Sequence, residues 1–274
     1  MMQQQPFSRR DLTALFVGFG LVVSVIIFFA ARNSSSEKID DPISSETTAE
    51  SKSSLPTITP TEAKKRLLSG TLGKIIDTRS ETAYQASHIP DSASMPLSKL
   101  PEYFPSQEDG EILVITETDD AAQAETAKIL SGKNVRYLLI KGGLVAWEYS
   151  GGQVVSFGNP SSPTDRSKVT FVSMDDFQKI VNGREILYAI VDVRTKEAFA
   201  KSHVPEAMNI PLAELERRRN EIPPATNIAL YAETDLDAFQ AAVRLFDLGM
   251  YSVKTLSVGF PEWESKGMPT EKSK

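Results

Sequence analysis

The sequence of 274 residues contains no cysteine. A chain without a thiol forms no disulfide bond, and it offers neither a thiolate nucleophile nor a sulfur atom that can carry a persulfide. The absence says little about the cellular compartment, because secreted and cytosolic proteins both occur without cysteine. It excludes every mechanism that depends on a cysteine of this chain.

The chain is acidic beyond the amino-terminal segment. Residues 1–32 carry a charge of +2, so the rest of a chain with a formal net charge of −6 holds −8. Nucleic acid and anionic lipid surfaces would repel such a chain, and no basic patch with interleaved aromatic residues appears. The sequence therefore predicts no nucleic-acid partner.

One long apolar run, LTALFVGFGLVVSVIIFFAA, occupies residues 12–31 and carries no charge. About 20 residues at ~1.5 Å each suffice to cross a hydrocarbon core of roughly 30 Å. Phe28 and Phe29 stand before Ala30 and Ala31, where a cleaved signal peptide would need a small-x-small site. We predict a short tail over residues 1–11 and an uncleaved anchor over residues 12–32, with the bilayer as partner through residues 12–31.

The charges beside this run set its expected orientation. Arg9, Arg10 and the free amino terminus outweigh Arg32 and Lys38 slightly, which favours a cytoplasmic amino terminus. The arginine pair partly resembles a twin-arginine export signal; alternatively it marks the cytoplasmic membrane edge, with the same topology. The expected protein is a single-pass inner-membrane protein with periplasmic domains, and residues 33–58, rich in Ser, Thr and Glu, are expected to form a flexible tether.

The rest of the chain repeats itself. Ile76-Asp77-Thr78-Arg79 returns as Val191-Asp192-Val193-Arg194, and the His-Ile-Pro turn at His88 returns as His-Val-Pro at His203, both 115 residues later. Gly143 and Trp147 return as Gly259 and Trp263, 116 residues later. A drift of one residue over so long a span indicates duplicated domains.

Each copy alternates short apolar runs with helix signals. Thr59-Pro60-Thr61-Glu62 and Ser173-Met174-Asp175-Asp176 predict helix starts, and Gly70 and Gly183 predict left-handed residues at the helix ends. The predicted strands are 74–77, 112–115 and 137–140, then 188–192, 228–231 and 253–256; further helices are predicted over 119–130 and 235–248. This alternation favours an α/β fold with a parallel sheet covered on both faces. The predicted domains are 59–155 and 169–270, joined by a turn-rich linker over 156–168.

Each half resembles a rhodanese-like domain, the α/β module of sulfurtransferases and their phosphatase relatives. The resemblance rests on Asp77-x-Arg79, His88-Ile89-Pro90 and Gly142-Gly143-x-x-x-Trp147, and on Asp192-x-Arg194, His203-Val204-Pro205 and Gly259-x-x-x-Trp263. It implies two small parallel sheets with helices on both faces. The glycine that usually follows the His-Ile-Pro turn is replaced by Asp91 and Glu206.

The resemblance places the family's catalytic cysteine at Thr116 and Ala232, directly after the strands that end at Ile115 and Tyr231. A threonine hydroxyl without an adjacent base is a poor nucleophile, and alanine offers none. Cap residues and carboxylates are expected to occupy the helix starts at which family members bind anions, namely Thr118, Asp119 and Asp120, and Thr234, Asp235 and Asp237. The resemblance thus implies two vestigial sites, no enzyme activity and no cofactor.

The other motif residues each allow two interpretations. His88 and His203 make structural hydrogen bonds, or they are metal ligands or general bases, although no metal site is expected. Each Asp-x-Arg pair braces its loop, or it is a reactive ion pair. Trp147 and Trp263 belong to the core or anchor a partner. The run Arg217-Arg218-Arg219 lies on a mixed-charge helix face or meets an acidic partner.

Three kinds of function remain open. The leading hypothesis is a non-catalytic, membrane-tethered tandem protein that acts as a scaffold or accessory subunit of a membrane protein complex. The second is enzymatic: the domains present a substrate to a sulfurtransferase that supplies the thiol, or Thr116 and nearby carboxylates perform an unrelated hydrolysis, although no Ser-His-Asp or metal constellation accompanies them. The third is sensing of a small anion or sulfur compound in one vestigial pocket.

Overall fold

The computed structural model describes residues 55–103, 110–183, 187–224 and 226–273. All of them belong to one compact unit, residues 53–274. The predicted tail, the anchor over residues 12–32 and most of the tether lie outside the described residues. In the part that is described, no helix combines the length and apolarity that a membrane crossing requires.

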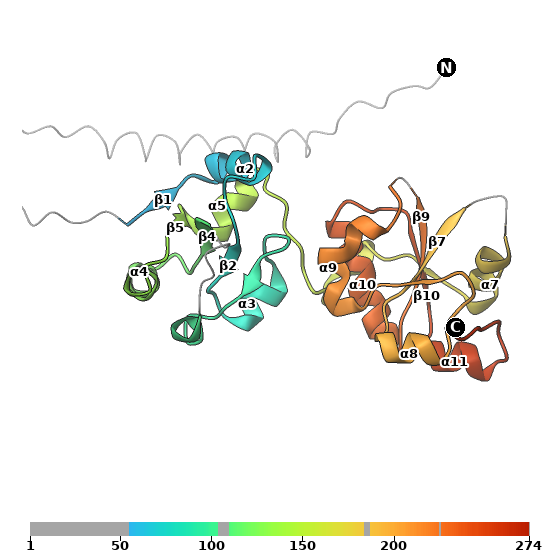
Figure 1. Ribbon diagram of the computed structural model, residues 1–274. Coiled ribbons are helices and arrows are strands. Elements are labelled where there is room, and N and C mark those ends of the chain that lie inside the picture. The colour runs from blue at the N-terminus through green and yellow to red at the C-terminus, as the bar shows by residue number, and fades with distance from the viewer. Residues whose placement is uncertain (1–54, 104–109, 184–186, 225, 274) are drawn as a thin grey trace, which may run out of the picture. The chain divides into compact units, whose positions relative to one another are not determined.

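Each repeat folds into its own parallel five-stranded sheet, and the two sheets have equivalent topologies (Figure 1). The first sheet has the order β1-β5-β4-β2-β3 and the second the order β6-β10-β9-β7-β8, so each strand takes the place of its counterpart. This confirms the predicted α/β class with two parallel sheets. The strands are β1 (Thr57–Ile58), β2 (Ile75–Asp77), β3 (Ala93–Ser94), β4 (Ile112–Ile115), β5 (Tyr137–Ile140), β6 (Phe171–Val172), β7 (Tyr188–Asp192), β8 (Met208–Asn209), β9 (Asn227–Tyr231) and β10 (Val253–Leu256).

The helices begin where the sequence signals placed them. Thr59 and Ser173 accept hydrogen bonds from the N–H groups of Glu62 and Asp176, which caps α2 and α7. The α-helices are α2 (Pro60–Leu68), α3 (Glu81–Ala86), α4 (Asp120–Gly132), α5 (Gly143–Tyr149), α6 (Pro163–Ser167), α7 (Met174–Asn182), α8 (Lys196–Lys201), α9 (Leu215–Arg218), α10 (Asp235–Asp247) and α11 (Phe260–Ser265). Short 3-10 turns occupy Leu100–Glu102, Leu212–Glu214 and Arg219–Glu221.

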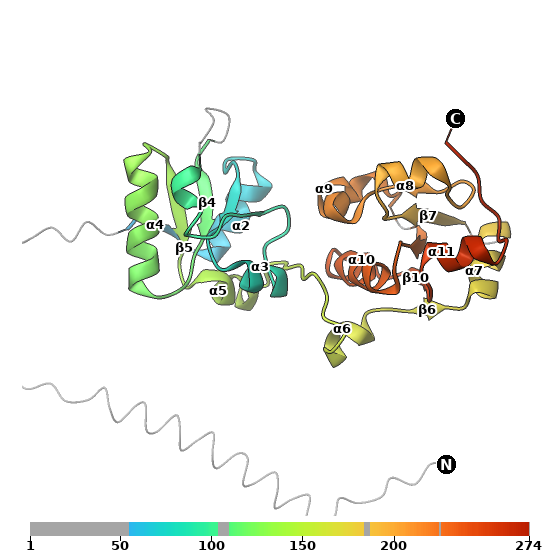
Figure 2. The same ribbon diagram turned by 90° about the horizontal axis from the view of Figure 1, so that it is seen from below.

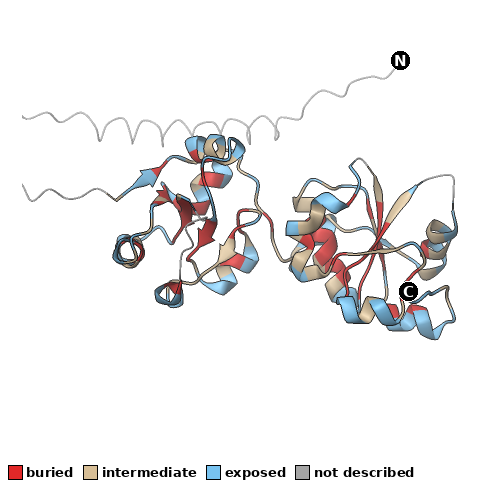
Figure 3. Ribbon diagram, viewed as in Figure 1, coloured by how far each residue is buried: buried red, intermediate tan, exposed pale blue. Residues whose placement is uncertain are grey.

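Side chains of the central strands alternate between two apolar layers. In β4, Leu113 and Ile115 pack with residues of α2 and α5, whereas Ile112 and Val114 pack with residues of α4 on the opposite face. Figure 2 shows α4 and α2 on opposite sides of the first sheet. The strands between them are the most deeply buried part of each repeat (Figure 3). Burial on both faces explains why these strands are continuous apolar runs in the sequence.

The end of α7 differs from the prediction. Gly70, after α2, adopts the expected left-handed conformation with a φ of 66°. Gly183, after α7, has a φ of −75° instead, so the left-handed prediction is wrong there. A Cβ atom at position 183 would lie 2.8 Å from the carbonyl oxygen of Lys179. Glycine is needed at this position because the helix carbonyl approaches it closely, not because of its backbone angles.

Short elements also occur in segments that the sequence assigned to tether and linker. Thr57 and Ile58 form β1 and pair with Leu139 and Ile140 of β5. Residues 163–167 of the linker form α6. Strands of two residues and helices of five carry too little periodicity to stand out in a sequence.

The close approach of Gly259 to the backbone of Glu233 provides a test of this arrangement. A Cβ atom at Gly259 would lie 2.3 Å from the carbonyl oxygen of Glu233, in the loop that leads to α10. We expect Gly259→Ala to lower the free energy of unfolding by more than about 1 kcal/mol, because backbone must move. Gly132→Ala, at the end of α4 with open space around it, should leave stability unchanged or raise it by up to about 1 kcal/mol. Urea unfolding of both variants is the measurement, and equal stabilities would contradict the close approach.

Candidate functional site

An aspartate–arginine pair closes the carboxyl end of β2 in the first repeat and of its counterpart β7 in the second. The Arg79 N–H and Nε donate to Asp77 Oδ1, both at 3.0 Å, and Arg79 Nη2 donates to Asp77 Oδ2 at 2.6 Å. Nη2 also donates to the Ser87 carbonyl oxygen at 2.6 Å. The Asp77 side chain is fully buried, so its charge depends on this partner. The arrangement braces the strand against the end of α3 and presents no free carboxylate.

The second repeat builds the same brace. Arg194 Nη2 donates to Asp192 Oδ2 at 2.7 Å and to the Ser202 carbonyl oxygen at 2.6 Å. Its guanidinium carbon also lies 3.6 Å from the centroid of the Phe260 ring. Burial lowers the pKa of Arg194, but its hydrogen bonds with Asp192 raise it, and the net shift is upward. Arg194 therefore remains a cation held by its own loop.

The positions that the resemblance gives to a catalytic cysteine are covered. Thr116 is nearly buried, and its Oγ1 lies 3.4 Å from Thr126 Oγ1. Ala232 is fully buried, and its carbonyl oxygen accepts a hydrogen bond from the Phe260 N–H at 2.9 Å. A hydroxyl paired with another hydroxyl has no base to activate it. Neither position presents a nucleophile.

Side chains of the chain itself cap the two helices that follow. Asp119 Oδ1 accepts from the Ala122 N–H at 2.8 Å at the start of α4. At the start of α10, Thr234 Oγ1 accepts from the Asp237 N–H at 3.1 Å and donates to Asp237 Oδ2 at 2.7 Å. These helix starts are where an anion would otherwise bind. Their local carboxylates already occupy that positive field.

The two caps differ by one position. The cap of α10 is Thr234, whereas the cap of α4 is Asp119 and not Thr118, the counterpart of Thr234. The carbonyl oxygen of Thr118 instead accepts a hydrogen bond from Gln123 Nε2 at 3.1 Å. The helix start is thus shifted by one residue, which the repeat pattern alone did not reveal.

The two histidines are held in the same way. His88 Nδ1 lies 2.8 Å from the Tyr84 carbonyl oxygen, and His203 Nδ1 lies 2.9 Å from that of Phe199. Each ring stacks on the side chain that supplies this carbonyl, with centroids 3.9 Å and 3.8 Å apart. A carbonyl only accepts, so Nδ1 is the donor in both rings. Within the four described ranges, no group of three potential ligands is placed to hold a metal ion.

The second ring nitrogen distinguishes the repeats. His203 Nε2 lies 3.4 Å from Glu271 Oε1, in the segment whose backbone also pairs with His203. His88 pairs through its backbone with Val155, which has no carboxylate, and its Nε2 faces Glu216 Oε2 at 3.2 Å. Glu216 belongs to α9 of the second repeat. The second repeat thus supplies the carboxylate that the first one lacks.

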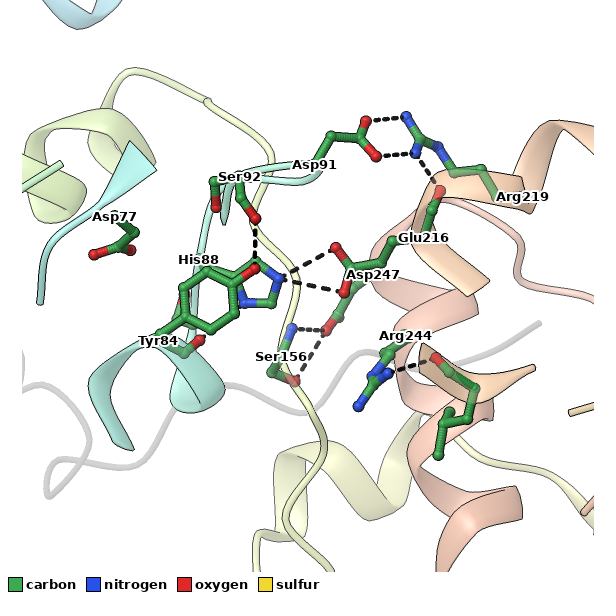
Figure 4. Close-up of polar contacts among 12 residues, drawn as sticks. Asp77, Tyr84, His88, Asp91, Ser92, Ser156, Glu216, Arg219, Arg244 and Asp247 are labelled. Carbon is green, nitrogen blue, oxygen red and sulfur yellow. Dashed lines mark hydrogen bonds and ion pairs between the residues drawn. The ribbon is translucent and has the colours of Figure 1, made fainter. Parts of the chain in front are cut away.

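Further contacts join the repeats around this histidine (Figure 4). Arg219 donates from Nη1 and Nη2 to the two carboxylate oxygens of Asp91, both at 2.8 Å. Asp247 Oδ2 accepts from the N–H and Oγ of Ser156, both at 3.1 Å, and its Oδ1 pairs with Lys168 at 2.8 Å. The run Arg217-Arg218-Arg219 does meet an acidic residue through Arg219, but that residue, Asp91, belongs to the same chain.

Asp91 and Glu206 occupy the position of the missing glycine. Both have a φ of 64°, the left-handed conformation that glycine adopts without strain. An aspartate in this conformation costs roughly 1–2 kcal/mol relative to a relaxed backbone. The same aspartate forms the ion pair with Arg219.

The tryptophans are core residues. Trp147 and Trp263 are 4% and 0% exposed. Their Nε1 atoms donate to the carbonyl oxygens of Gln153 at 2.9 Å and of Pro269 at 3.0 Å. A tryptophan with its ring covered and its N–H satisfied is not available to anchor a partner.

Described residues of the two repeats line two hollows. One of about 630 Å³ lies beside Thr116. The other, the inter-repeat cavity of about 1220 Å³, is lined by Tyr84, Asp91, Ser92, Phe157, Val193, Arg194, Thr195, Ala198, Pro211, Leu212, Ala213, Glu216, Arg217, Arg219, Asn220, Glu233, Asp237, Gln240 and Arg244. Tyr84 donates its hydroxyl to the Ser92 carbonyl oxygen at 2.6 Å, and burial raises the pKa of Tyr84 to about 12. Tyr84 is therefore a neutral donor at physiological pH.

Comparisons with known proteins agree with the repeated architecture. The family model described as a rhodanese-like domain matches residues 59–150 and again residues 173–266. The putative sulfur carrier protein YrkF of Bacillus subtilis is 27% identical over 175 residues, covering 63% of this chain and 90% of that protein. A sulfurtransferase of Allochromatium vinosum is 27% identical over 92 residues, covering 34% of this chain and 84% of that protein.

Among solved structures, the thiosulfate sulfurtransferase from Pseudomonas aeruginosa aligns with a TM-score of 0.41 and 20% identity. The alignment covers 80% of this chain and 44% of that one. This chain therefore spans less than half the length of that solved protein.

The buried brace yields a stability prediction. Asp192→Asn removes the charge that compensates Arg194, whose side chain is only 4% exposed, and we expect a loss of about 3–5 kcal/mol in unfolding free energy. Glu233→Gln is the matched control, because Glu233 lies 3.9 Å from Arg194 Nη1 with its side chain 54% exposed. The control should change stability by at most about 0.5 kcal/mol. Chemical denaturation measures both; an Asp192→Asn protein as stable as the control would refute the bracing role.

Proposed function

Since this chain belongs to the rhodanese-like domain family, with one match in each repeat, we propose that it is a non-catalytic member that acts by binding other proteins. Its role is that of a membrane-tethered scaffold or accessory subunit of a membrane protein complex. One observation carries this proposal: where family members need a thiol and a free anion site, this chain has no thiol and fills the helix starts with its own caps.

The chemistry of sulfur transfer explains why the absence of a thiol matters. A sulfur atom must be accepted by a thiolate as a persulfide and then passed on, and no other side chain forms this intermediate reversibly. The chain contains no cysteine. The names of the bacterial relatives, a sulfurtransferase and a sulfur carrier, therefore describe an activity that this chain cannot perform unaided.

The helix starts support the same proposal independently of the missing thiol. Asp119 and Thr234 satisfy N–H groups of the first turn, and Asp120, Asp235 and Asp237 place carboxylates there. An incoming oxyanion would face like charge and backbone donors already in use. A site altered in both its nucleophile and its anion cradle is not one substitution away from catalysis.

The amino-terminal part of the chain suggests where the protein acts. The apolar run over residues 12–31 is proposed to hold the protein in the inner membrane, with residues 33–54 linking it to the folded repeats on the periplasmic side. A coil of about 22 residues reaches roughly 23–28 Å on average. Tethering raises the effective concentration of the repeats near membrane partners, so weak contacts suffice for assembly.

Purification in mild detergent tests the scaffold role. We expect the full chain, carrying an affinity tag, to retain one or more proteins in stoichiometric amounts through affinity and size-exclusion steps. An unrelated single-pass membrane protein with the same tag, extracted in the same detergent, is the control for adventitious capture. Recovery of the chain as a lone, monodisperse monomer would contradict a scaffold or subunit role.

A second experiment tests the loss of catalysis. The double variant Thr116→Cys, Ala232→Cys restores a thiol at both positions, but we expect no turnover with thiosulfate as donor and cyanide as acceptor. The caps still occupy the anion sites, and Ala232 is fully buried. A cysteine-containing rhodanese assayed in parallel shows that the assay works, and circular dichroism shows that the variant is folded. Multiple turnovers by the double variant would mean that the loops remain competent.

A further inference from the structure

The inter-repeat cavity contains a buried arginine without a carboxylate partner. Arg244, on α10, is 6% exposed and lines the cavity. Its Nη1 donates to the Leu212 carbonyl oxygen at 2.9 Å, and its guanidinium carbon lies 4.0 Å from the Phe157 ring centroid. Its Nε is buried and has no hydrogen-bond partner. Among the described residues, no carboxylate lies within 4.0 Å of Arg244.

Two other arginines with mostly covered side chains each have a carboxylate partner. Arg79 and Arg194 direct Nε and Nη2 at an aspartate, which forms a charge-assisted fork on that edge of the guanidinium. Arg244 has no such fork. Burial lowers its pKa, while the charge of the more distant Glu216 opposes that shift. A cation kept in this environment lacks the counter-charge that buried arginines usually have.

A second unpartnered polar atom lines the same cavity from the first repeat. Ser92 is 7% exposed, and its Oγ is buried without a hydrogen-bond partner. Its carbonyl oxygen is already used by Tyr84. Native structures leave few buried polar atoms unpaired, and here two of them belong to residues that line one cavity.

Charged side chains of both signs line the cavity. Asp237, Gln240 and Arg244 follow one another at helical spacing along the face of α10 that lines it. Seven residues at ~1.5 Å each separate Asp237 from Arg244 by about 10 Å. Glu233 also lines the cavity, with its Oε2 3.9 Å from Arg194 Nη1. A ligand with one negative charge fits at Arg244, whereas a second negative charge toward Asp237 is disfavoured.

Apolar surface adjoins the arginine. The Phe157 ring covers the guanidinium, and Leu212 and Pro211 also line the cavity. Phe157 is held by its N–H, which donates to the Gln85 carbonyl oxygen at 2.9 Å. Gly158, with a φ of 80°, lets the linker approach within 3.2 Å of Val243, measured from the Cβ position that glycine leaves empty. The apolar wall is therefore built in place beside the cation.

We propose that the inter-repeat cavity binds a small organic monocarboxylate, whose carboxylate pairs with Arg244 and whose apolar part packs on Phe157, Pro211 and Leu212. The ligand supplies the counter-charge that Arg244 lacks and contacts both repeats. Binding of this kind requires no thiol. It also does not depend on the proposed scaffold role, because loss of the partner proteins would leave the cavity unchanged.

Calorimetric titration of the full chain in detergent tests the proposal, with benzoate and hexanoate as probes and empty micelles as the blank. Both probes should bind saturably to the wild type at constant ionic strength. Phthalate, with a second carboxylate, should bind at least several-fold more weakly than benzoate. Absence of saturable binding by both probes, or phthalate binding as tight as benzoate binding, overturns the proposal.

Variants locate the site. Arg244→Met keeps an unbranched side chain and removes the cation, and benzoate binding should weaken about tenfold or more, as loss of a charge-assisted hydrogen bond implies. Arg136→Gln removes the same charge from an exposed side chain of the first repeat that does not line the cavity, and binding should stay within about twofold. Unchanged binding in Arg244→Met, or equal loss in both variants, overturns the assignment.

Arg244→Lys keeps the test decisive should the methionine variant fail to fold. Lysine retains the positive charge but has no planar fork, so benzoate affinity should fall between those of the wild type and a protein without the cation. Wild-type affinity in Arg244→Lys together with unchanged discrimination against phthalate would show that the guanidinium does not receive the carboxylate.

Discussion

A buried carboxylate at the carboxyl end of β2 and of β7 organises each repeat. Asp77 and Asp192 are fully buried, and such a charge is tolerated only when its oxygens are fully engaged. The arginine two residues later satisfies this need and reaches on to the Ser87 or Ser202 carbonyl oxygen. That second contact fixes the end of α3 or α8, from which the histidine turn departs. The arginine thereby fixes the strand, the helix and the histidine turn relative to one another. The loops that follow these elements are positioned by them.

The same geometry in both repeats explains how the fold persists without a cysteine. The brace, the stacked histidine and the buried tryptophan all serve the architecture, and none depends on a thiol or a bound anion. Once the helix starts are capped by Asp119 and Thr234, their donors are satisfied by the chain itself. The rhodanese-like fold then needs no substrate for its stability, since its core and braces are complete without one.

Duplication also supplied the means of joining the repeats. His203 meets a carboxylate from its own domain, Glu271, whereas His88 meets Glu216 from the other repeat. The ion pair of Asp91 with Arg219 and the contacts of Asp247 with the linker lie beside this histidine (Figure 4). The joint is polar, and it borders a cavity lined by Arg244, which has no carboxylate partner among the described residues. A ligand contacting both walls of that cavity would stabilise the joint directly.

The sequence by itself determined the α/β class, the two repeats, the main strands and helices and the lack of any thiol, because apolar runs, caps and composition are local properties. It also indicated the Asp-x-Arg brace, whose partners are two residues apart. Only the tertiary structure decided that Gly183 is needed for a close carbonyl contact, and that two-residue strands complete each sheet. It alone placed Glu216 at His88 and Arg219 at Asp91, pairs separated by 128 residues. No periodicity relates side chains so far apart; the folded backbone brings them together, and it likewise leaves Arg244 buried beside an open cavity.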